Sequence, residues 1–251
     1  MKLSKKHCFS FLQLILMFSM SFAQDATEIV RKADEHAKSK TSVAEITIQI
    51  IRPTWSREMS MKTWIKGNDL AMLLITGPAK DKGIVYLKRK KEVWNWIPSI
   101  ERNIKLPPSM MSQSWMGTDF TNDDLVKEAS VVVDYNHHLI GEQEIDARDC
   151  YKIQMIPKPE AAIIWGKVIL WVDKKDFMML RAEYYDEENE LINTMTTGDI
   201  KMLGGKLLPS RMEMIPHDKK GNKTIMIYNS LVFDTPVDDG FFSTQNMLRV
   251  K

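Results

Sequence analysis

The chain alternates apolar and polar residues over much of its length. In the segment EITIQII, Ile46, Ile48 and Ile50 alternate with polar residues, and MSMKTWI at 59–65 repeats the pattern. A period of two residues places successive side chains on opposite faces of a β-strand. Both segments are therefore predicted to be strands.

A helical period precedes these strands. Asp25 can cap a helix, with Glu28 three residues later completing the capping pattern. The apolar residues on one face of this helix are Ile29, Val30, Ala33 and Ala37. The pattern predicts one amphipathic helix that ends near Lys40.

Short polar segments punctuate the rest of the chain. They are KGND at 66–69, DKG at 81–83, DKKD at 173–176, DEENE at 186–190, GG at 204–205 and DKKGNK at 218–223. Residues of these types preset turns or tolerate left-handed backbone, so each segment is predicted to join two antiparallel strands. The result is a meander of about ten strands. No linker or fixed-period repeat divides it, which favours a single domain.

Several predicted strands are apolar on both faces. They include LAMLLIT at 70–76, KVILWV at 167–172 and TIMIYNSLVF at 224–233. In strands of a sheet with one solvent-exposed face, apolar and polar residues would alternate more regularly. Other parts of the chain must therefore cover the second face. The first helix is one candidate. The other is residues 107–129, where Pro107 and Pro108 stop the preceding strand and the two-residue period is lost.

The N-terminus has the pattern of a secretory leader. Three lysines precede an apolar run at 9–22, and Ser21-Phe22-Ala23 then offers a small-x-small cleavage site. We predict a signal peptide at residues 1–23 and a single mature domain at 24–251. A retained anchor is the alternative, but the run falls short of the roughly 20 residues that span a bilayer. Cys8 precedes the apolar run and so cannot be a lipidated first residue, and Cys150 then has no disulfide partner.

Net charge does not point to a polyanionic partner. The chain has 35 Lys and Arg residues and 33 Asp and Glu residues, and three of the lysines lie in the predicted leader. The mature chain is therefore nearly neutral, and neither nucleic acid nor an anionic membrane is expected as a partner.

The common catalytic motifs are absent. The sequence has no G-x-S-x-G elbow, no H-E-x-x-H motif, no glycine-rich phosphate loop and no C-x-x-C pair. His137 and His138 are neighbours on a predicted strand, so their rings point to opposite faces and do not form a shared metal site. We predict a protein that is not an enzyme and that has no cofactor or metal ion.

Residues 112–127, SQSWMGTDFTNDDLVK, lie in the interrupted segment and combine aromatic and acidic residues. The acidic group lacks the spacing, the glycine and the late glutamate of a calcium-binding EF-hand loop. Helix initiation explains it better, with Thr121 or Asn122 as N-cap and Asp123 and Asp124 in the first turn.

Methionine and tryptophan are the more unusual signal, with 18 and seven residues. Methionine is flexible and polarisable, so a surface rich in it adapts to apolar ligands of varying shape. Taken singly, each of these residues fits an ordinary core. The group that gathers around the interrupted segment is Trp94, Trp96, Met110, Met111, Trp115, Met116 and Phe120. This concentration favours an apolar binding site.

The run at 93–127 resembles the hallmark segment of outer membrane lipoprotein-sorting proteins, which are relatives of the periplasmic carrier LolA. The matching residues are Trp94-x-Trp96-x-Pro98, Arg102, the hexapeptide WMGTDF that starts at Trp115, and Asp124-Leu125. The segment DDGFFSTQNM from Asp238 is similar to the family's closing segment. The resemblance covers essentially the whole mature chain.

This resemblance implies a mainly β, LolA-like fold. The expected structure is an incomplete antiparallel barrel of about ten to eleven strands, with an N-terminal helix and a helical or loop lid on its concave side. The implied function is a periplasmic carrier that shields the acyl chains of lipoproteins or lipids on their way to the outer membrane. An envelope sensor, or an accessory protein of an RND-type exporter, is the alternative.

The implied partners are lipoprotein acyl chains or free lipid, with an inner-membrane transporter and an outer-membrane acceptor, and the carrier is expected to be a monomer. The predicted cavity and lid residues are Met59, Met61, Trp64, Met72, Trp94, Trp96, Met110, Met111, Trp115, Met116, Phe120, Trp165 and Trp171. The predicted lid tether consists of Arg102, Gly117 and Asp119. In this hypothesis Trp115, Met116 and Phe120 fill the cavity when no ligand is bound. An esterase and a purely structural envelope protein stay open as other classes.

Overall fold

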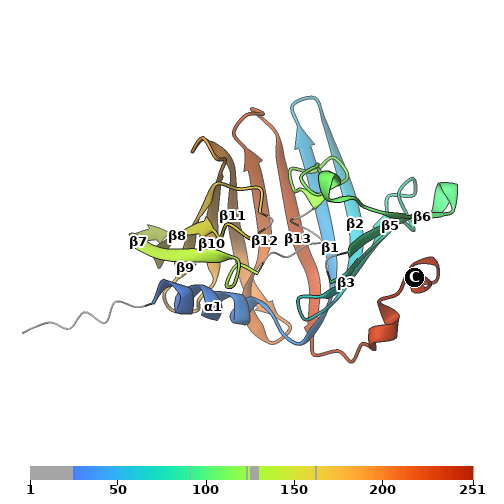
Figure 1. The fold of residues 1–251 in the computed structure, drawn as a ribbon, viewed down its shortest axis with the longest axis horizontal. Coiled ribbons are helices and arrows are strands. Elements are labelled where there is room, and N and C mark those ends of the chain that lie inside the picture. Colours follow the sequence, from blue (N-terminus) through green and yellow to red (C-terminus); the bar gives the residue numbers. More distant parts are fainter. Residues whose placement is uncertain (1–24, 91, 123, 125–129, 162, 251) are drawn as a thin grey trace, which may run out of the picture.

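The structure is a computed structural model that describes residues 25–90, 92–122, 124, 130–161 and 163–250. The predicted leader at 1–23 lies outside these residues, and so does Asp123. The described part contains one α-helix and a single large antiparallel sheet (Figure 1).

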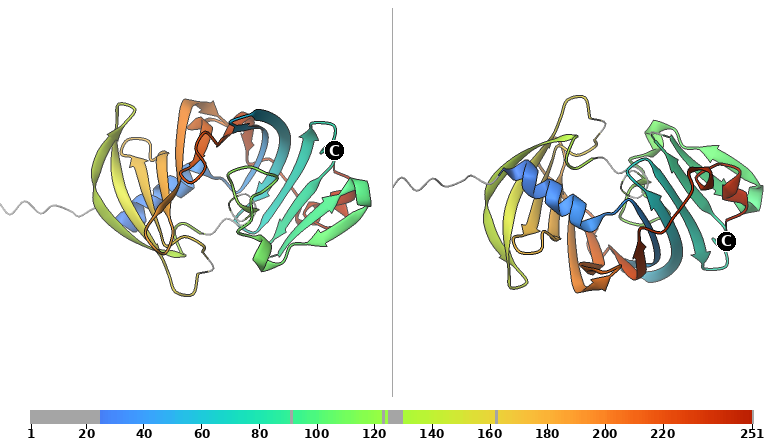
Figure 2. Two further views of the ribbon diagram at one scale, coloured as in Figure 1. Left: turned by 90° about the horizontal axis from the view of Figure 1, so that it is seen from above. Right: turned by 90° about the horizontal axis from the view of Figure 1, so that it is seen from below.

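The sheet has 13 strands, arranged in the order β6-β5-β4-β3-β2-β1-β13-β12-β11-β10-β9-β8-β7. The strands of one half are β1 (Thr41–Arg52), β2 (Trp55–Lys66), β3 (Leu70–Gly77), β4 (Val85–Arg89), β5 (Glu92–Ile97) and β6 (Arg102–Lys105). Those of the other half are β7 (Tyr135–Ile145), β8 (Arg148–Pro157), β9 (Lys167–Asp173), β10 (Met179–Tyr185), β11 (Leu191–Leu203), β12 (Lys206–Pro216) and β13 (Lys223–Phe233). The pairing of β1 with β13 joins two meanders into one open, strongly curved sheet (Figure 2).

The turns predicted from polar segments lie between consecutive strands, as expected. The segment at 66–69 joins β2 to β3, and the glycine pair at 204–205 joins β11 to β12. The predicted antiparallel meander is therefore confirmed. The predicted number of strands is too low, partly because the turns at Lys90 and at Asp146 and Ala147 carry no glycine or proline signal.

The N-terminal helix α1 (Ala26–Ala37) begins as predicted. The Asp25 carboxylate accepts a hydrogen bond from the Thr27 amide at 3.0 Å. The helix ends at Ala37, before the predicted end near Lys40, and Ala37 is exposed. Ile29 and Val30 are fully buried, and the helix packs against β7 and β9 (Figure 2).

Both faces of the curved sheet bury apolar residues. We call the group on the concave side the inner cluster; it includes residues of α1 and of both meanders, such as Ile48, Leu73 and Leu170. The convex face of β3 and β4 carries Met72, Leu74, Val85 and Leu87, which pack against Phe242 and Met247. We call residues 237–250 the C-terminal clamp. Its two short 3₁₀ helices are η3 (Asp239–Phe241) and η4 (Asn246–Leu248), and Figure 1 shows it beside β3.

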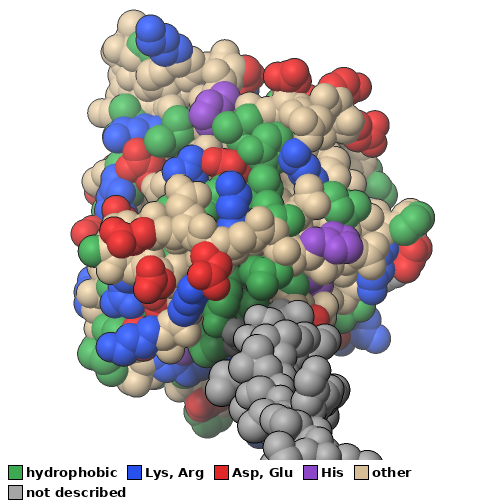
Figure 3. Space-filling view, turned by 90° about the vertical axis from the view of Figure 1, so that its left-hand side faces the viewer, with side chains coloured by type: hydrophobic (Ala, Val, Ile, Leu, Met, Phe, Trp, Pro, Cys, Tyr) green, Lys and Arg blue, Asp and Glu red, His purple; other side chains and the backbone are tan. Residues whose placement is uncertain are grey.

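A third apolar group lies on the outer face of the other meander. Its buried members are Cys150, Ile169, Trp171, Met178 and Leu180. Basic and acidic side chains are interspersed on the face of the molecule shown in Figure 3. In the described part of the chain, no helix is both long enough and apolar enough to span a membrane.

Candidate apolar binding site

Residues 113–122 form a short hairpin on the concave side, which we call the inner hairpin. The Trp115 amide donates to the Phe120 carbonyl at 2.9 Å, and the Thr118 amide donates to the Trp115 carbonyl at 2.9 Å. Met116 and Gly117 make the turn between them with φ angles of 49° and 80°. Two successive residues with positive φ give the tight turn that matches the twist of a β-hairpin.

Two 3₁₀ helices, η1 (Pro98–Ile100) and η2 (Pro108–Met110), flank β6 and lead into the inner hairpin. At its far end Thr121 acts as a helix N-cap. The Thr121 hydroxyl accepts from the Asp124 amide at 3.1 Å, and the Asp124 carboxylate accepts from the Thr121 amide at 2.8 Å. This reciprocal pair has the hydrogen bonds of a capping box, as predicted for a helix start here, and the rest of the predicted first turn lies outside the described residues. The Asp124 carboxylate therefore pairs with a backbone amide.

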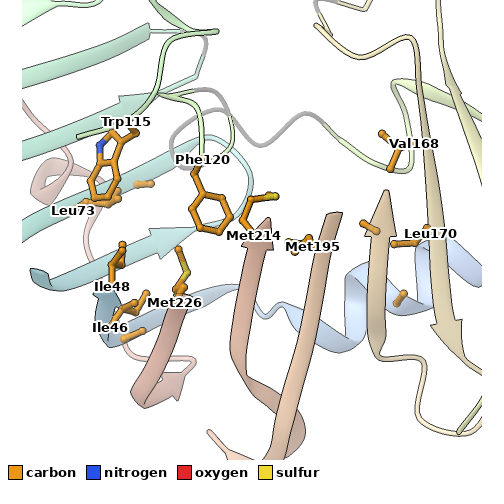
Figure 4. Close-up of a cluster of buried hydrophobic side chains, with 14 of the residues drawn as sticks. Ile46, Ile48, Leu73, Trp115, Phe120, Val168, Leu170, Met195, Met214 and Met226 are labelled. Atoms are coloured by element: carbon orange, nitrogen blue, oxygen red, sulfur yellow. The ribbon is translucent and has the colours of Figure 1, made fainter. Parts of the chain in front are cut away.

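The inner hairpin inserts two aromatic side chains into the inner cluster. Trp115 is 0% exposed and Phe120 is 3% exposed. Figure 4 shows Trp115 pointing toward Leu73 and Phe120 pointing toward Met214 and Met226 on the central strands. The hairpin therefore fills space on the concave side with its own aromatic rings.

Asp119 is held by Arg52 and Thr224. Nη1 of Arg52 donates to the Asp119 carboxylate at 3.0 Å, and the Thr224 hydroxyl donates to the same oxygen at 2.7 Å. Nη2 of Arg52 also donates to the Gly117 carbonyl at 2.7 Å. Arg102, the predicted tether, instead lies exposed on β6 at the edge of the sheet, and Arg52 holds Asp119 in its place.

Eight of the predicted cavity and lid residues pack in or against the inner cluster. They are Met59, Met61, Met110, Met111, Trp115, Met116, Phe120 and Trp165. They come from β2, from the segment after β6 and from the loop before β9. The structure therefore brings together most of the aromatic and methionine residues around the interrupted segment.

The other five predicted residues lie on the opposite face of the sheet. Trp64, Met72, Trp94 and Trp96 pack in the group covered by the C-terminal clamp, and Trp171 packs in the third apolar group. Their assignment to the cavity is corrected here. The physical reason is strand alternation: where both faces are apolar, the sequence pattern does not tell which face is concave.

Strand methionines that the sequence analysis did not single out complete the inner cluster. They are Met155, Met179, Met195, Met212, Met214 and Met226. Four of them belong to the three neighbouring strands β11, β12 and β13, and the paired positions Met195 and Met214 lie side by side. The two-residue spacing of Met212 and Met214 in β12 could have placed them on one face of a strand from the sequence alone. The concave face is thus lined by flexible, polarisable side chains over much of its width.

Tyrosines at the two ends of the inner cluster stay protonated. Burial raises the pKa of Tyr86 to about 12, and burial also raises the pKa of Tyr184 well above its usual range. Their rings lie 5.6 Å from Trp115 and 5.1 Å from Trp165. The inner surface is therefore apolar with a few neutral hydrogen-bonding groups.

Two surface hollows lie outside the inner hairpin. One of about 510 Å³ is lined by Thr27 of α1 together with His137 and Lys158, and one of about 910 Å³ lies between Lys40 and Asp234. Neither is lined by Trp115 or Phe120. Within the described ranges, no three His, Cys, Asp or Glu side chains are grouped as metal ligands would be.

Solved structures that share this architecture include three proteins of similar length. A DUF1329 family protein from Desulfovibrio piger aligns with a TM-score of 0.81 and 23% identity, over 88% of this chain and 97% of that chain. A putative outer membrane lipoprotein-sorting protein domain from Vibrio parahaemolyticus aligns at 0.80 and 20% identity, over 89% and 98%. A LolA superfamily protein from Nitrosomonas europaea aligns at 0.77 and 24% identity, over 89% and 100%.

These identities are below one quarter, so the alignments show a common fold and no more. The predicted LolA-like fold is confirmed at that level. A family model whose description reads "uncharacterized protein" matches residues 67–249. No curated protein matches the chain.

Proposed function

We propose that this chain, which belongs to the uncharacterized family whose model matches residues 67–249, is a periplasmic carrier of acyl chains. In this proposal the concave side of its LolA-like sheet shields the acyl chains of lipoproteins or lipids from water. The inner hairpin acts as a lid that leaves when a ligand enters. The proposal assigns the chain no catalytic role.

The observation that carries the proposal is the position of the inner hairpin. A segment without its own sheet partner places the fully buried rings of Trp115 and Phe120 among strand residues on the concave face (Figure 4). Large apolar side chains from a separable segment can be exchanged for an alkyl chain of similar character. The same surface would then be buried with either occupant.

Energetics favours an exchange of this kind. Burying one methylene is worth about 0.8 kcal/mol, so a chain of about 16 carbons gains on the order of 10 kcal/mol before ordering costs. Returning Trp115 and Phe120 to water costs about 2–3 kcal/mol for each ring. The lid therefore lowers the net affinity, which lets a carrier release its ligand.

Arg52 is well placed to control the lid. It lies at the end of β1 and bonds both to the Asp119 carboxylate and to the Gly117 carbonyl. Together with the Thr224 hydroxyl these bonds anchor the turn side of the inner hairpin, and none of them belongs to a strand pair of the sheet. We propose Arg52 and Asp119 as the latch of the lid.

The proposal is tested by extracting lipid from the purified protein. The chain would be exported with its leader in a Gram-negative host, purified without detergent, and analysed by solvent extraction and mass spectrometry. A carrier should yield acyl lipid in stoichiometric amount, and the emptied protein should bind a fluorescent fatty acid. Repeated recovery of no lipid, together with no binding of the fluorescent fatty acid, would contradict the proposal.

A pull-down separates the carrier from the alternatives of a sensor and an exporter accessory protein. A carrier meets its inner-membrane transporter and outer-membrane acceptor only transiently. A stable complex with a membrane signalling protein would instead favour the sensor, and a stable complex with an RND-type exporter would favour the accessory role.

A further inference from the structure

The two aromatic rings of the inner hairpin lie against different kinds of side chain. Trp115 points toward Leu73, and its ring centroid is 5.6 Å from that of Tyr86 (Figure 4). Leu73 and Tyr86 are directly opposite each other in the β3–β4 ladder, and both are buried. Leucine has well-defined rotamers and the tyrosine ring is rigid. The surface under Trp115 therefore has a fixed shape.

The ring of Phe120 lies against methionines instead. It points toward Met214 and Met226 (Figure 4). Met214 is opposite Met195 in the β11–β12 ladder, and Met226 is opposite Met212 in the β12–β13 ladder. Opposite residues of an antiparallel pair have side chains within contact distance, and residues two apart on one strand share a face. These four methionines therefore form one continuous surface, which we call the methionine patch.

The methionine patch can change its shape more easily than the strand beside it. A methionine side chain is unbranched, has three rotatable bonds and fills irregular gaps. Next to the patch, β1 contributes Ile46, Ile48 and Ile50 to the inner cluster, and Ile48 is opposite Met226. Isoleucine is branched at Cβ, which restricts its first side-chain torsion. In the proposed exchange, the departure of Phe120 thus opens a slot with an adaptable wall.

We propose that the slot under Phe120 accepts acyl chains with a cis double bond or a methyl branch as readily as straight chains, and that the methionine patch determines this tolerance. The inference rests on the proposed function, because the slot opens only when the inner hairpin leaves. A kink or branch widens the chain locally, which a tightly packed surface of fixed shape penalises. Flexible methionines repack around the wider part. The ligand class is therefore acyl lipids of mixed chain shape.

The test compares ligands that differ in the shape of the alkyl chain. Palmitic acid is straight, palmitoleic acid has a cis double bond and isopalmitic acid has a methyl branch, while all three have the same number of carbons and the same carboxyl group. Each would compete with a fluorescent fatty acid for the emptied wild-type protein. We expect the three inhibition constants to lie within about threefold of one another.

A double variant assigns the tolerance to the methionine patch. Met214→Leu combined with Met226→Leu keeps the volume of the surface and replaces flexible side chains with branched ones. It should weaken palmitoleic and isopalmitic acid about fivefold or more relative to palmitic acid. If melting curves show that the double variant does not fold, Met226→Leu alone is compared, with the same expected direction.

The matched control makes the same substitution on the other face of the sheet. Met72→Leu combined with Met247→Leu changes two buried methionines of the group covered by the C-terminal clamp. Because neither residue belongs to the inner cluster, this variant should keep the wild-type ratios of the three inhibition constants.

The outcomes distinguish this inference from the carrier function. A wild-type preference for palmitic acid above about threefold would overturn the inference, as would wild-type ratios in the folded patch variant or equal changes in the control. Each of these results would leave the carrier function standing. Failure of the fluorescent fatty acid and of all three ligands to bind would contradict the carrier function itself.

Discussion

Asp119 connects the inner hairpin to the two strands that join the halves of the sheet. Its carboxylate meets Arg52 at the end of β1 and Thr224 at the start of β13. The side chains of Arg52 and Asp119 are only 11% and 5% exposed. Removing one member of such a pair leaves the other charge buried without compensation, which costs more than the pair itself contributes.

Asp119→Asn should therefore lower the free energy of unfolding by about 3 kcal/mol and speed the uptake of a fluorescent fatty acid. Urea denaturation and stopped-flow fluorescence would measure the two effects. Lys105→Gln is the control, because Lys105 pairs with Glu92 at the half-exposed edge of the sheet and should contribute little. Equal unfolding midpoints and uptake rates for the two variants would contradict the latch.

Cys150 is expected to be chemically inert in the folded protein. It is 0% exposed, and its thiol donates to the Arg148 carbonyl at 3.3 Å. Burial raises the pKa of Cys150 to about 11, whereas an unfolded thiol ionises near pH ~8.5.

At pH 8 we therefore expect slow alkylation of Cys150 in native leader-free protein and fast alkylation in guanidinium chloride. The raised pKa also predicts a contribution to stability that is complete below pH ~8.5 and is lost as the pH rises toward the folded pKa, about 11. Cys150→Ser should remove this part of the alkaline loss. Rapid alkylation of the native thiol at pH 8 would show that the site opens.

At the scale of elements, the features that depend only on neighbouring residues could be predicted from the sequence. They include the Asp25 cap, the alternation at Ile46 and Ile48, and the glycine turns. The turn at Asp146 and Ala147 could not be predicted, because these residues adopt φ angles of 48° and 60° without a glycine. Missing turns of this kind made the predicted strand count too low.

The candidate site was predictable only in part for a related reason. The loss of the two-residue period marked residues 107–129, and the inner hairpin lies within that segment. Arg52 was not identified because its partner Asp119 is 67 positions away in the chain, and only the sheet brings them together. The faces of Met72 and Leu73 were likewise undetermined until the curvature of the sheet was known.

The turn of the inner hairpin requires left-handed backbone at Gly117, where φ is 80°. Gly117→Ala should therefore lower the free energy of unfolding by roughly 1 kcal/mol, because a Cβ atom disfavours this conformation. Gly198→Ala is a matched control, since Gly198 lacks a positive φ and a Cβ there would meet open space. Thermal melting would compare the two, and equal loss in both variants would contradict this account of the turn.

At the scale of the whole molecule, three segments cover a sheet that is apolar on both faces. Helix α1 and the inner hairpin lie on the concave side, and the C-terminal clamp lies on the convex side of β3 and β4. The clamp is fixed by Phe242 and Met247, which are 0% and 1% exposed. The two faces thus have separate covers, and only the concave cover is proposed to move.

Shortening a buried side chain of the C-terminal clamp should lower stability without changing the affinity of the proposed cavity for its ligand. Met247→Ala should lower the free energy of unfolding by about 2–5 kcal/mol, because it leaves a hole in a closed apolar group. Leu248→Ala, at the neighbouring 54% exposed position, should change it by less than about 0.5 kcal/mol. Chemical denaturation would measure both, and equal effects would contradict the proposed packing of the clamp. Fatty acid affinity should be unchanged in each folded variant.

The measurement that tests the central claim most directly is the affinity of Trp115→Ala for a fluorescent fatty acid. If Trp115 occupies the space that an acyl chain takes, removing its ring removes the competitor, and affinity should rise about tenfold or more relative to wild type. Met202→Ala, which truncates a 64% exposed methionine, should bind as the wild type does. Unchanged or weaker binding by folded Trp115→Ala would contradict the claim that the inner hairpin gives way to the ligand.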